Sequence, residues 1–363
     1  MTGGPQGILP DREIGALIAA GAIRLAEPAA KNQVQPASLD LRLGRKAVRV
    51  RASFLPGPGV LVADKLSQLG LHEFNLSQGA VLETGCVYIV ELLESLRLPP
   101  DIAASANPKS STGRLDIFTR LITDRARGFD QMPEGYAGPL YLEISPRTFP
   151  ILVRTGSRLS QIRFRRGGAV LGDAALAELH ERETLSSGAP RFINGLALSI
   201  DLNGDERGLV GYRAKRYTGL IDVDRIGAYG VAEFWEPIRR GERPEIVLDP
   251  DQFYILVSGE AVHVPPDYAA EMVPFDPLVG EFRVHYAGFF DPGFGHAPAG
   301  GHGSRAVLEV RSHEVPFILE HGQTIGRLVY EPMAAPPETL YGAALGSNYQ
   351  AQGLKLSKHF RSA

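Results

Sequence analysis

One stretch of the sequence occurs twice and decides how the chain is organised. Residues 81–104 read VLETGCVYIVELLESLRLPPDIAA, and residues 247–270 read VLDPDQFYILVSGEAVHVPPDYAA. The copies lie 166 residues apart and share Val-Leu, Tyr-Ile, a glutamate and Pro-Pro-Asp-x-Ala-Ala at matching positions. Self-similarity at a fixed offset is typical of a duplicated structural unit. The sequence therefore predicts two halves of similar fold.

The repeat extends beyond this stretch in both directions. The same offset aligns Leu142-Glu143 with Leu308-Glu309, and a slightly shorter one aligns residues 38–41 (SLDL) with residues 199–202 (SIDL). The matches end near residue 335, which leaves one unmatched tail that is either disordered or closes over a ligand. We predict three parts: a first domain at residues 1–167, a second domain at residues 168–335 and a C-terminal tail or lid at residues 336–363.

The periodicity inside each half is that of β-strands. Residues 87–90 are a short apolar run bounded by turn residues, and in residues 140–144 apolar side chains alternate with Tyr141 and Glu143, as in a strand with one inward face. Asp11 and Asp173 are predicted to be the N-caps of two short helices, at residues 12–20 and 174–181. We therefore predict a mainly β fold of two closed β modules with a few short helices.

The composition excludes several classes of protein. A formal net charge of −3 provides no general field that would attract nucleic acid or a membrane surface, and the apolar run at residues 14–23 is too short to span a bilayer. Cys86 is the single cysteine, so neither an intrachain disulfide nor a zinc site with two thiolates can form. We expect a cytoplasmic protein without zinc that acts on neither nucleic acid nor membranes.

The two halves differ most at residues 107–115, where the first reads NPKSSTGRL and the second reads VPFDPLVGE. Hydroxyl groups, Lys109 and Arg114 are suited to bind a polyphosphate, and an arginine can do so in a bidentate manner. The stretch is not a Walker A loop, and a Ser/Thr/Gly cluster is also typical of an ordinary turn. Residues 144–166 add several arginines and no acid, which predicts either a site for a small anion or a solvated basic face.

Glu143 is the second candidate for chemistry, because a carboxylate within a strand needs a reason to be there. Such a group either pairs with an arginine or is suited to proton transfer. Glu309 occupies the equivalent position in the second half. That match indicates a structural requirement or the remnant of an ancestral site, and the residues alone leave both interpretations open.

These motifs, taken in order, resemble the dCTP deaminase / dUTPase superfamily. Residues 35–44 (QPASLDLRLG) are similar to its opening strand, and residues 109–115 (KSSTGRL) to its Ser-Ser-x-(Ala/Gly)-Arg nucleotide motif. Residues 129–143 resemble its Ile-Asp-Pro-Gly-Trp-x-Gly…Leu-Glu segment, which the second half repeats as FDPGF at residues 290–294. The tail, with Tyr341 and residues 348–353, resembles the C-terminal lid. The resemblance covers nearly the whole chain and is to fused, double-length bacterial dCTP deaminases.

The resemblance implies a fold and a reaction. The fold would be two tandem dUTPase-like domains, each a distorted jelly-roll β-barrel, assembled into a homo-oligomer, with a trimer favoured and sites between subunits. The reaction would convert dCTP and water to dUTP and ammonia without zinc, in the supply of dUMP and dTTP. Mg²⁺ would be bound through the substrate triphosphate, and inhibition by dTTP, common in the family, is left open by the sequence.

The resemblance also assigns residues. Glu143 matches the catalytic glutamate that moves protons between water and cytosine, and Ser110 and Arg114 match the essential serine and arginine. The remaining nucleotide-contacting positions would be Lys109, Ser111, Thr112, Gly113, Ala126, Asp130, Tyr341 and Gln352. Ala126 would help to hold the water through its carbonyl, and Asp130 would contact the deoxyribose. The family's tail lysine is replaced by Asn348, and the second half, which lacks the serine and the arginine, is expected to be catalytically silent.

Two other functions fit the same residues. One is a dUTP pyrophosphatase, or a bifunctional enzyme that continues from dCTP to dUMP, in which Asp130 would activate water at phosphorus. The other is a non-catalytic module that binds deoxynucleotides. Ammonia with dUTP, pyrophosphate with dUMP, or no turnover at all distinguishes these readings.

Overall fold

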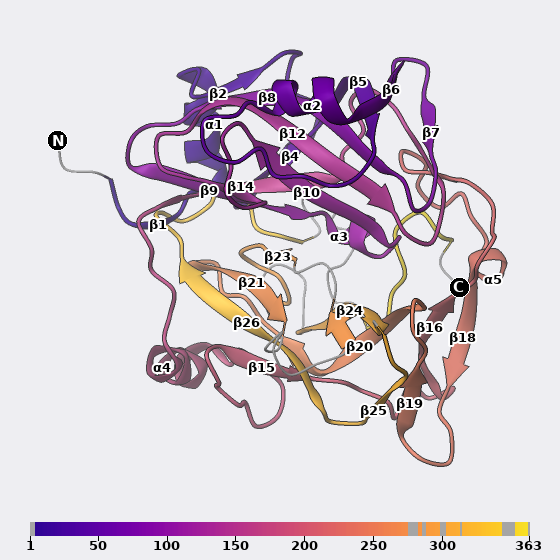
Figure 1. Ribbon diagram of the computed structural model, residues 1–363. Helices are drawn as coiled ribbons and strands as arrows, with labels where there is room; N and C mark the ends of the chain where they lie inside the picture. The colour runs from indigo at the N-terminus through magenta and orange to yellow at the C-terminus, as the bar shows by residue number, and fades with distance from the viewer. Residues whose placement is uncertain are drawn as a thin grey trace. The chain divides into compact units, whose positions relative to one another are not determined.

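The computed structural model describes residues 4–274, 282–284, 288–297, 303–312, 314–342 and 353–361. The chain is mainly β with a few short helices (Figure 1). It divides into two compact units, neither of which is a continuous stretch. The first unit contains residues 1–168, 217–229 and 333–338, and the second contains residues 169–216, 230–332 and 339–363.

The first unit is built on two large antiparallel sheets and one small sheet. One large sheet has the strand order β11-β9-β14-β4-β3, with β1 paired to β14, and the other has the order β10-β12-β8-β5-β6, with β2 paired to β8. The small sheet has the order β17-β13-β7. The strands are β1 (Gly7–Ile8), β2 (Ile23–Leu25), β3 (Val34–Gln35), β4 (Ser38–Leu41), β5 (Leu43–Val50), β6 (Gly70–Asn75), β7 (Ala80–Leu82), β8 (Val87–Arg97), β9 (Ile102–Pro108), β10 (Ile117–Thr123), β11 (Gln131–Met132), β12 (Ala137–Pro146), β13 (Ile151–Val153), β14 (Ser160–Arg166) and β17 (Ile221–Asp222).

The second unit repeats the strand order of the first. Its sheets have the orders β23-β21-β26-β15, β22-β24-β20-β16-β18 and β19-β25. Most of these strands lie where the repeat places them, so that β24 corresponds to β12 and β20 to β8. The strand that takes the place of β4 is an exception, because it covers residues 196–199 and not residues 199–202. The strands are β15 (Leu196–Ser199), β16 (Leu209–Ala214), β18 (Trp235–Arg239), β19 (Glu245–Leu248), β20 (Phe253–Val262), β21 (Tyr268–Pro274), β22 (Phe282–Val284), β23 (Phe289–Phe290), β24 (Ser304–Ser312), β25 (Phe317–Glu320) and β26 (Thr324–Pro332).

A glutamate that occurs in both copies of the repeat accepts a backbone N–H from a neighbouring segment in each unit. Glu94 on β8 accepts hydrogen bonds from the backbone N and the Nε of Arg42, both at 2.7 Å, and Glu260 on β20 accepts bonds from the N and Oγ of Ser199 at 2.8 and 2.7 Å. Burial raises the pKa of Glu94, while the hydrogen bonds from Arg42 act in the opposite direction. This glutamate is therefore part of the duplicated fold.

The segment at residues 217–229 belongs to the first unit although it lies in the second half of the sequence. Its strand β17 pairs in parallel with β13, with Ile221 opposite Ile151. Arg154 donates two hydrogen bonds to the carboxylate of Asp222, at 2.7 and 2.9 Å. Alignment of the two halves of the sequence cannot reveal that β17 joins the first unit, because β17 and its partner β13 lie far apart in the chain.

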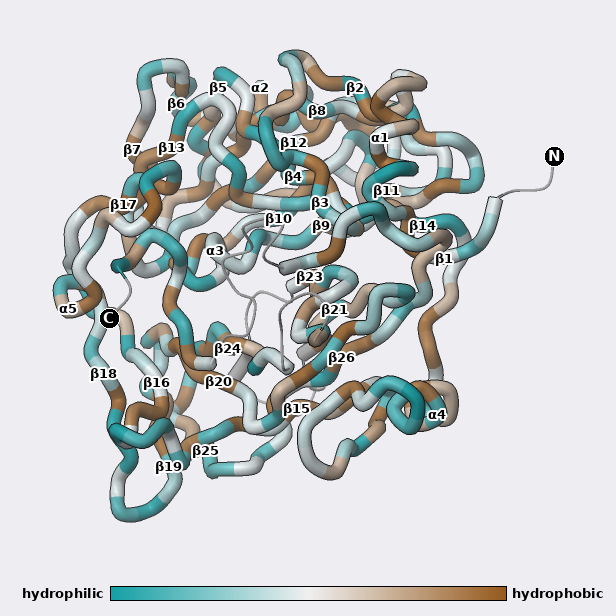
Figure 2. Tube along the Cα trace, turned by 180° about the vertical axis from the view of Figure 1, so that it is seen from behind, coloured by the Kyte–Doolittle hydropathy of each residue, from teal (hydrophilic) through white to brown (hydrophobic). Residues whose placement is uncertain are grey.

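The prediction of a single inward face for residues 140–144 is too simple. All five residues are buried, and Tyr141 and Glu143 are only 7% and 1% exposed. Both faces of this part of β12 are therefore covered, whereas connections such as residues 240–244, between β18 and β19, are exposed and hydrophilic (Figure 2). None of the described helices is long and apolar enough to span a membrane.

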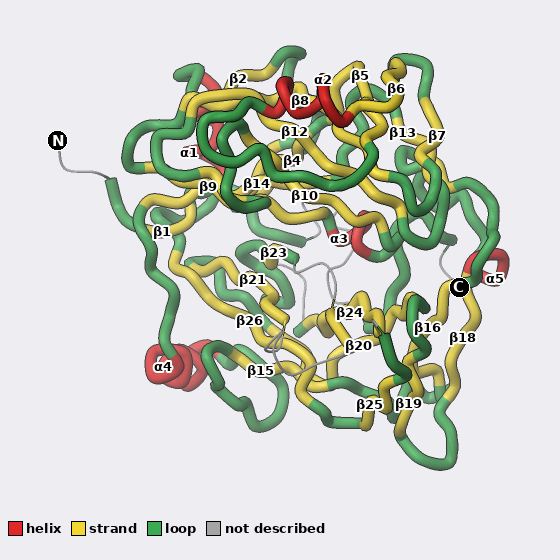
Figure 3. Tube along the Cα trace, in the orientation of Figure 1, coloured by secondary structure: helices red, strands yellow, loops and turns green. Residues whose placement is uncertain are grey.

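The helices are short (Figure 3). The two predicted helices begin one residue earlier than expected. The expected N-caps Asp11 and Asp173 are the first helical residues, and Pro10 and Gly172 precede them as caps. An acid in the first helical turn is stabilised by the helix dipole, and the Asp173 carboxylate also accepts the backbone N–H groups of Asn194 and Gly195. The helices are α1 (Asp11–Ala19), α2 (Val62–Leu69), α3 (Ser110–Gly113), α4 (Asp173–Glu183) and α5 (Val231–Phe234).

Candidate active site

Glu143 lies in the middle of a large sheet of the first unit. Its strand β12 runs between β10 and β8, and Glu143 is directly opposite Arg120 on one side and Ile89 on the other. Its Oε1 accepts hydrogen bonds from the Nε and Nη2 of Arg120, at 3.0 and 2.7 Å. Among the described residues, no group donates a hydrogen bond to its buried Oε2. Oε1 is thus held by Arg120, and Oε2 has no hydrogen-bond partner among the residues that the structure describes.

Arg120, which the sequence analysis did not single out, is itself held on two further sides. Its guanidinium carbon lies 3.6 Å from the centroid of the Phe129 ring, and its Nη2 donates a hydrogen bond to the Oγ of Ser53 at 2.5 Å. A cation over an aromatic face is stabilised by the ring quadrupole. The sequence feature that could have drawn attention to Arg120 is that it is the one charged residue in the strand Ile117–Thr123.

The predicted nucleotide motif folds into one short helical turn. Lys109 precedes α3 with extended backbone, and Arg114 ends the turn. Ser111, Thr112 and Gly113 are buried, and Arg114 is 3% exposed, whereas Lys109 and Ser110 are partly exposed. The polar surface of this motif within the unit is therefore concentrated at its first two residues.

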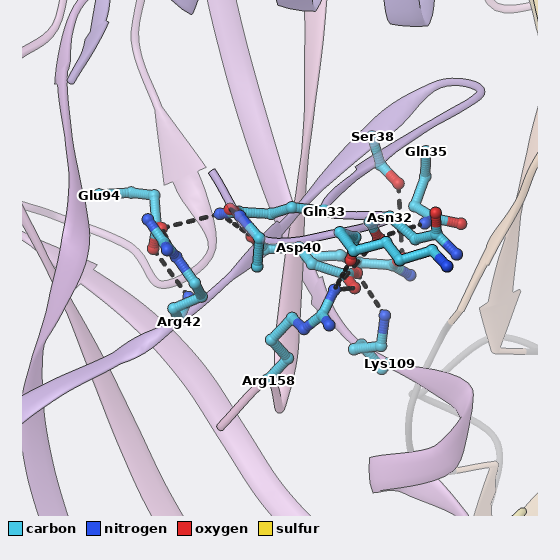
Figure 4. A network of polar contacts seen from close by, with 12 residues as sticks. Asn32, Gln33, Gln35, Ser38, Asp40, Arg42, Glu94, Lys109 and Arg158 are labelled. Atoms are coloured by element: carbon cyan, nitrogen blue, oxygen red, sulfur yellow. Dashed lines mark hydrogen bonds and ion pairs between the residues drawn. The ribbon is translucent and has the colours of Figure 1, made fainter. Parts of the chain in front are cut away.

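Lys109 is not a free cation. Its Nζ pairs with the Oδ1 of Asp40 on β4 (Figure 4), and Arg158 Nη1 lies 3.3 Å from Oδ2 of the same carboxylate. The Asp40 side chain is 4% exposed. A phosphate that binds Lys109 must therefore compete with a buried carboxylate that already has two cationic partners.

Asp130 and Ala126 both lie close to strand β10. Asp130 has a left-handed backbone, with φ of 62°, and its Oδ1 accepts the backbone N–H of Leu121 at 2.7 Å. The carbonyl of Ala126 accepts the N–H of Gly57 at 3.1 Å. A carbonyl oxygen has a second lone pair, so this contact leaves Ala126 one acceptor position for another donor.

The remaining predicted residues are not brought to this group within the first unit. Tyr341 belongs to the second unit, where its N–H donates to the carbonyl of Pro292 at 2.8 Å and its ring lies 5.7 Å from that of Phe294. Gln352 and Asn348 lie outside the described residues. Glu309 is buried on β24 opposite Ile255, the position that Glu143 has on β12.

Several arginines of the arginine-rich stretch are paired with acidic side chains. Arg154 pairs with Asp222, Arg158 with Asp40, and Arg166 with Asp101 and Glu13. Arg163 is 1% exposed. These acids come from distant parts of the sequence, so a local charge count overstates the free positive charge of residues 144–166.

Tyr141, two residues before Glu143 on β12, is a neutral phenol, and the described residues contain no cluster with the geometry of a metal centre. Burial, and secondarily the charge of Glu91, raises the pKa of Tyr141 to about 12, so that this phenol stays protonated at neutral pH. Within the described ranges, no group of three or more His, Cys, Asp and Glu side chains is arranged to hold a metal ion. Cys86 is a partly exposed free thiol.

Comparison with known proteins shows what the two halves are similar to. The family model "2'-deoxycytidine 5'-triphosphate deaminase (DCD) N-terminal domain" matches residues 5–168, and the model of the corresponding C-terminal domain matches residues 172–360. A protein of Parafrankia sp. named "dCTP deaminase, dUMP-forming" is 37% identical over 160 residues, which are 43% of this chain and 74% of that protein. The "dCTP deaminase" of Halorubrum lacusprofundi is 33% identical over 138 residues, 36% of this chain and 63% of that protein.

A solved structure extends the similarity to both halves. The crystal structure of 2'-deoxycytidine 5'-triphosphate deaminase from Agrobacterium tumefaciens has 68% sequence identity and a TM-score of 0.88, and the match covers 91% of this chain and 99% of that one. The two family models together match residues 5–168 and 172–360, and this structure covers most of the same chain. The chain therefore belongs to the dCTP deaminase family.

Proposed function

We propose that this chain deaminates dCTP to dUTP and ammonia, and so contributes to the supply of dUMP and dTTP. The observation that carries the proposal is the Glu143 carboxylate, with Oε1 held by Arg120 and the buried Oε2 without a partner among the described residues. A carboxylate in this state can accept a proton from water and deliver it elsewhere. It is placed on a central strand, where its geometry is rigid.

The reaction needs little more than this proton transfer and good positioning. Oε2 of Glu143 accepts a proton from water, the hydroxide forms a bond to C4 of cytosine, and the proton passes to N3. Glu143 then takes the proton of the C4 hydroxyl and delivers it to the C4 amino group, the C4–N bond breaks, ammonia leaves and a C4 carbonyl forms. Fixed dipoles stabilise the developing charge, and we assign this part to the Ser110 hydroxyl, the Arg114 guanidinium and the carbonyl of Ala126.

The nucleotide would be bound by the turn that begins at Lys109, with Ser111, Thr112 and Gly113 shaping it, and by Asp130 at the deoxyribose. Tyr341 and Gln352 would reach the nucleotide from the tail. Mg²⁺ would arrive on the triphosphate. Asp40, the carboxylate beside Lys109, is already paired with two cations and is therefore a poor metal ligand. This fits an ion that is held by the triphosphate and not by protein side chains.

The remaining proposals concern the assembly. We place the chain in the cytoplasm as a homo-oligomer, with a trimer favoured, built from two tandem dUTPase-like jelly-roll barrels. The second unit would be catalytically silent, would build the assembly and would complete a neighbouring site. The corresponding strands follow the same order in both units, which supports a duplicated barrel. Inhibition by dTTP would act at the same nucleotide site.

A second candidate is a bifunctional enzyme that continues to dUMP. It is favoured by a specific observation, since the Parafrankia relative is named dUMP-forming. Asp130 would then direct water to the α-phosphate, although its Oδ1 is engaged by Leu121. Incubation with dCTP and Mg²⁺, followed by measurement of ammonia and chromatography of nucleotides, decides the matter. Ammonia with dUTP supports deamination alone, dUMP adds the second activity, and binding of dCTP without turnover supports a non-catalytic module.

A further inference from the structure

We infer that Arg120 is a positioning residue for Glu143, which holds Oε1 so that Oε2 alone is presented for proton transfer. The inference rests on the proposed function, because it concerns the same carboxylate. It differs from the sequence-based assignments, which named Ser110 and Arg114 together with Glu143 and gave no role to position 120.

The hydrogen-bond pattern is asymmetric. A guanidinium that faces a carboxylate end-on binds both oxygens, one to each N–H group. Here both the Nε and the Nη2 of Arg120 donate to Oε1, at 3.0 and 2.7 Å. Oε2 is buried and receives no hydrogen bond from the described part of the chain. A buried polar atom without a partner costs stability, so this arrangement is expected where the atom has a use.

Arg120 is oriented by groups that are close to the site in the fold. The Phe129 ring covers one face of the guanidinium at 3.6 Å, and Ser53 accepts a hydrogen bond from Nη2. Phe129 precedes Asp130, whose carboxylate is fastened to Leu121, the residue after Arg120. The loop that carries Asp130 therefore also fixes the arginine. A lysine cannot reproduce the planar stacking or the two-donor fork.

The chain contains a matched pair without this burial. In the second unit Arg213 lies opposite Glu236 on neighbouring antiparallel strands, and its Nε and Nη2 both donate to one oxygen, at 3.0 and 2.5 Å. Both side chains are 46% exposed, whereas the side chain of Glu143 is 2% exposed. Arg213→Gln therefore removes the same kind of contact at a solvated surface.

The test compares Arg120→Gln, Arg120→Lys and Arg213→Gln with the wild type in steady-state deamination of dCTP across the pH range. For Arg120→Gln we expect kcat to fall about 100-fold or more, as for the loss of a group that organises a proton transfer, with KM changed by less than about threefold. The pH dependence of kcat should also change, because the cation that donates both hydrogen bonds to Oε1 is lost. Arg120→Lys should keep most of the pH profile but lose about tenfold in kcat.

A merely structural role predicts a different result. In that case Arg120→Gln lowers the thermal midpoint while the folded fraction retains the wild-type kcat and pH profile, and this outcome would overturn the inference. If Arg120→Gln does not fold, kcat and the pH profile of Arg120→Lys decide the question. Arg213→Gln should change neither kcat nor the pH profile. A wild type that releases no ammonia from dCTP overturns the proposed function, and the inference with it, so the two failures are distinguishable.

Discussion

Glu94 and Glu260 use both carboxylate oxygens, whereas Glu143 uses one. Glu94 accepts hydrogen bonds on both oxygens from Arg42, with Gln33 as a further donor, and Glu260 accepts from the N and Oγ of Ser199. Glu143 receives both of its hydrogen bonds on Oε1. Presence of a glutamate in both halves therefore does not separate a structural role from a chemical one; the occupancy of its oxygens does.

The largest effect should come from Glu143 itself. Glu143→Gln keeps the volume and the contact to Arg120 but removes the proton acceptor, so kcat for dCTP should fall at least about 100-fold. Glu309→Gln, at the equivalent position in the second unit, should leave kcat close to that of the wild type. Ammonia release measures both. A similar loss in the two variants would show that the second unit is not silent.

Next in size is the removal of the structural glutamates. Glu94→Ala leaves the buried Arg42 without its carboxylate partner, and we expect a loss of about 3–5 kcal/mol of unfolding free energy. Glu260→Ala removes hydrogen bonds to neutral groups only, and a loss of about 1–2 kcal/mol is expected. Urea denaturation measures both variants. Equal losses would contradict the assignment of a charged partner to Glu94 alone.

A smaller effect is expected where residues 217–229 join the first unit. Hydrogen bonds from Arg154 lower the pKa of Asp222 from its ordinary value of 3.8. The stabilisation is therefore present above that pH and is lost as pH falls through the lowered value. Because Arg154 is 38% exposed, solvent screens the pair, and Asp222→Asn should cost about 1 kcal/mol or less at pH 7.

Calorimetry at several pH values checks this prediction. At pH 7 the thermal midpoint of Asp222→Asn should lie about 2–4 °C below that of the wild type, or less. The gap should narrow as pH falls below 3.8 and close below the lowered pKa of Asp222, because the wild type then loses the same contribution. A gap that stays constant with pH would mean that the ion pair is not the cause.

The smallest effect concerns a histidine pair in the second unit. His263 Nε2 lies 2.6 Å from His296 Nδ1. Burial, and then the proximity of His263, lowers the pKa of His296 below its ordinary value of 6.5, and Glu183 acts weakly in the opposite direction. The folded state therefore disfavours protonation of His296, and the free energy of unfolding should decline as pH falls below about 6.5. His296→Gln should flatten this decline in thermal midpoints between pH 7.5 and 5; an unchanged slope would contradict the assignment.

The site was predictable where residues act through their own position in the sequence. The alternation in residues 140–144 placed Glu143 within a strand, and the difference between the halves singled out the turn at residues 109–114. Arg120 could not be predicted with the same means. Alternation tells which side chains share a face, but the register between two strands decides which residues are opposite, and nothing local specifies the register of β10 against β12.

The sequence by itself determined the duplication, the mainly β character and the family, because all three depend on spacings along the chain. Only the tertiary structure decided the partners of the charges. Lys109 meets Asp40, Arg154 meets Asp222 from the other half, and Glu143 meets Arg120 with one oxygen. These pairs join residues that are far apart in sequence, and their energies depend on burial, which exists only after the strands have come together.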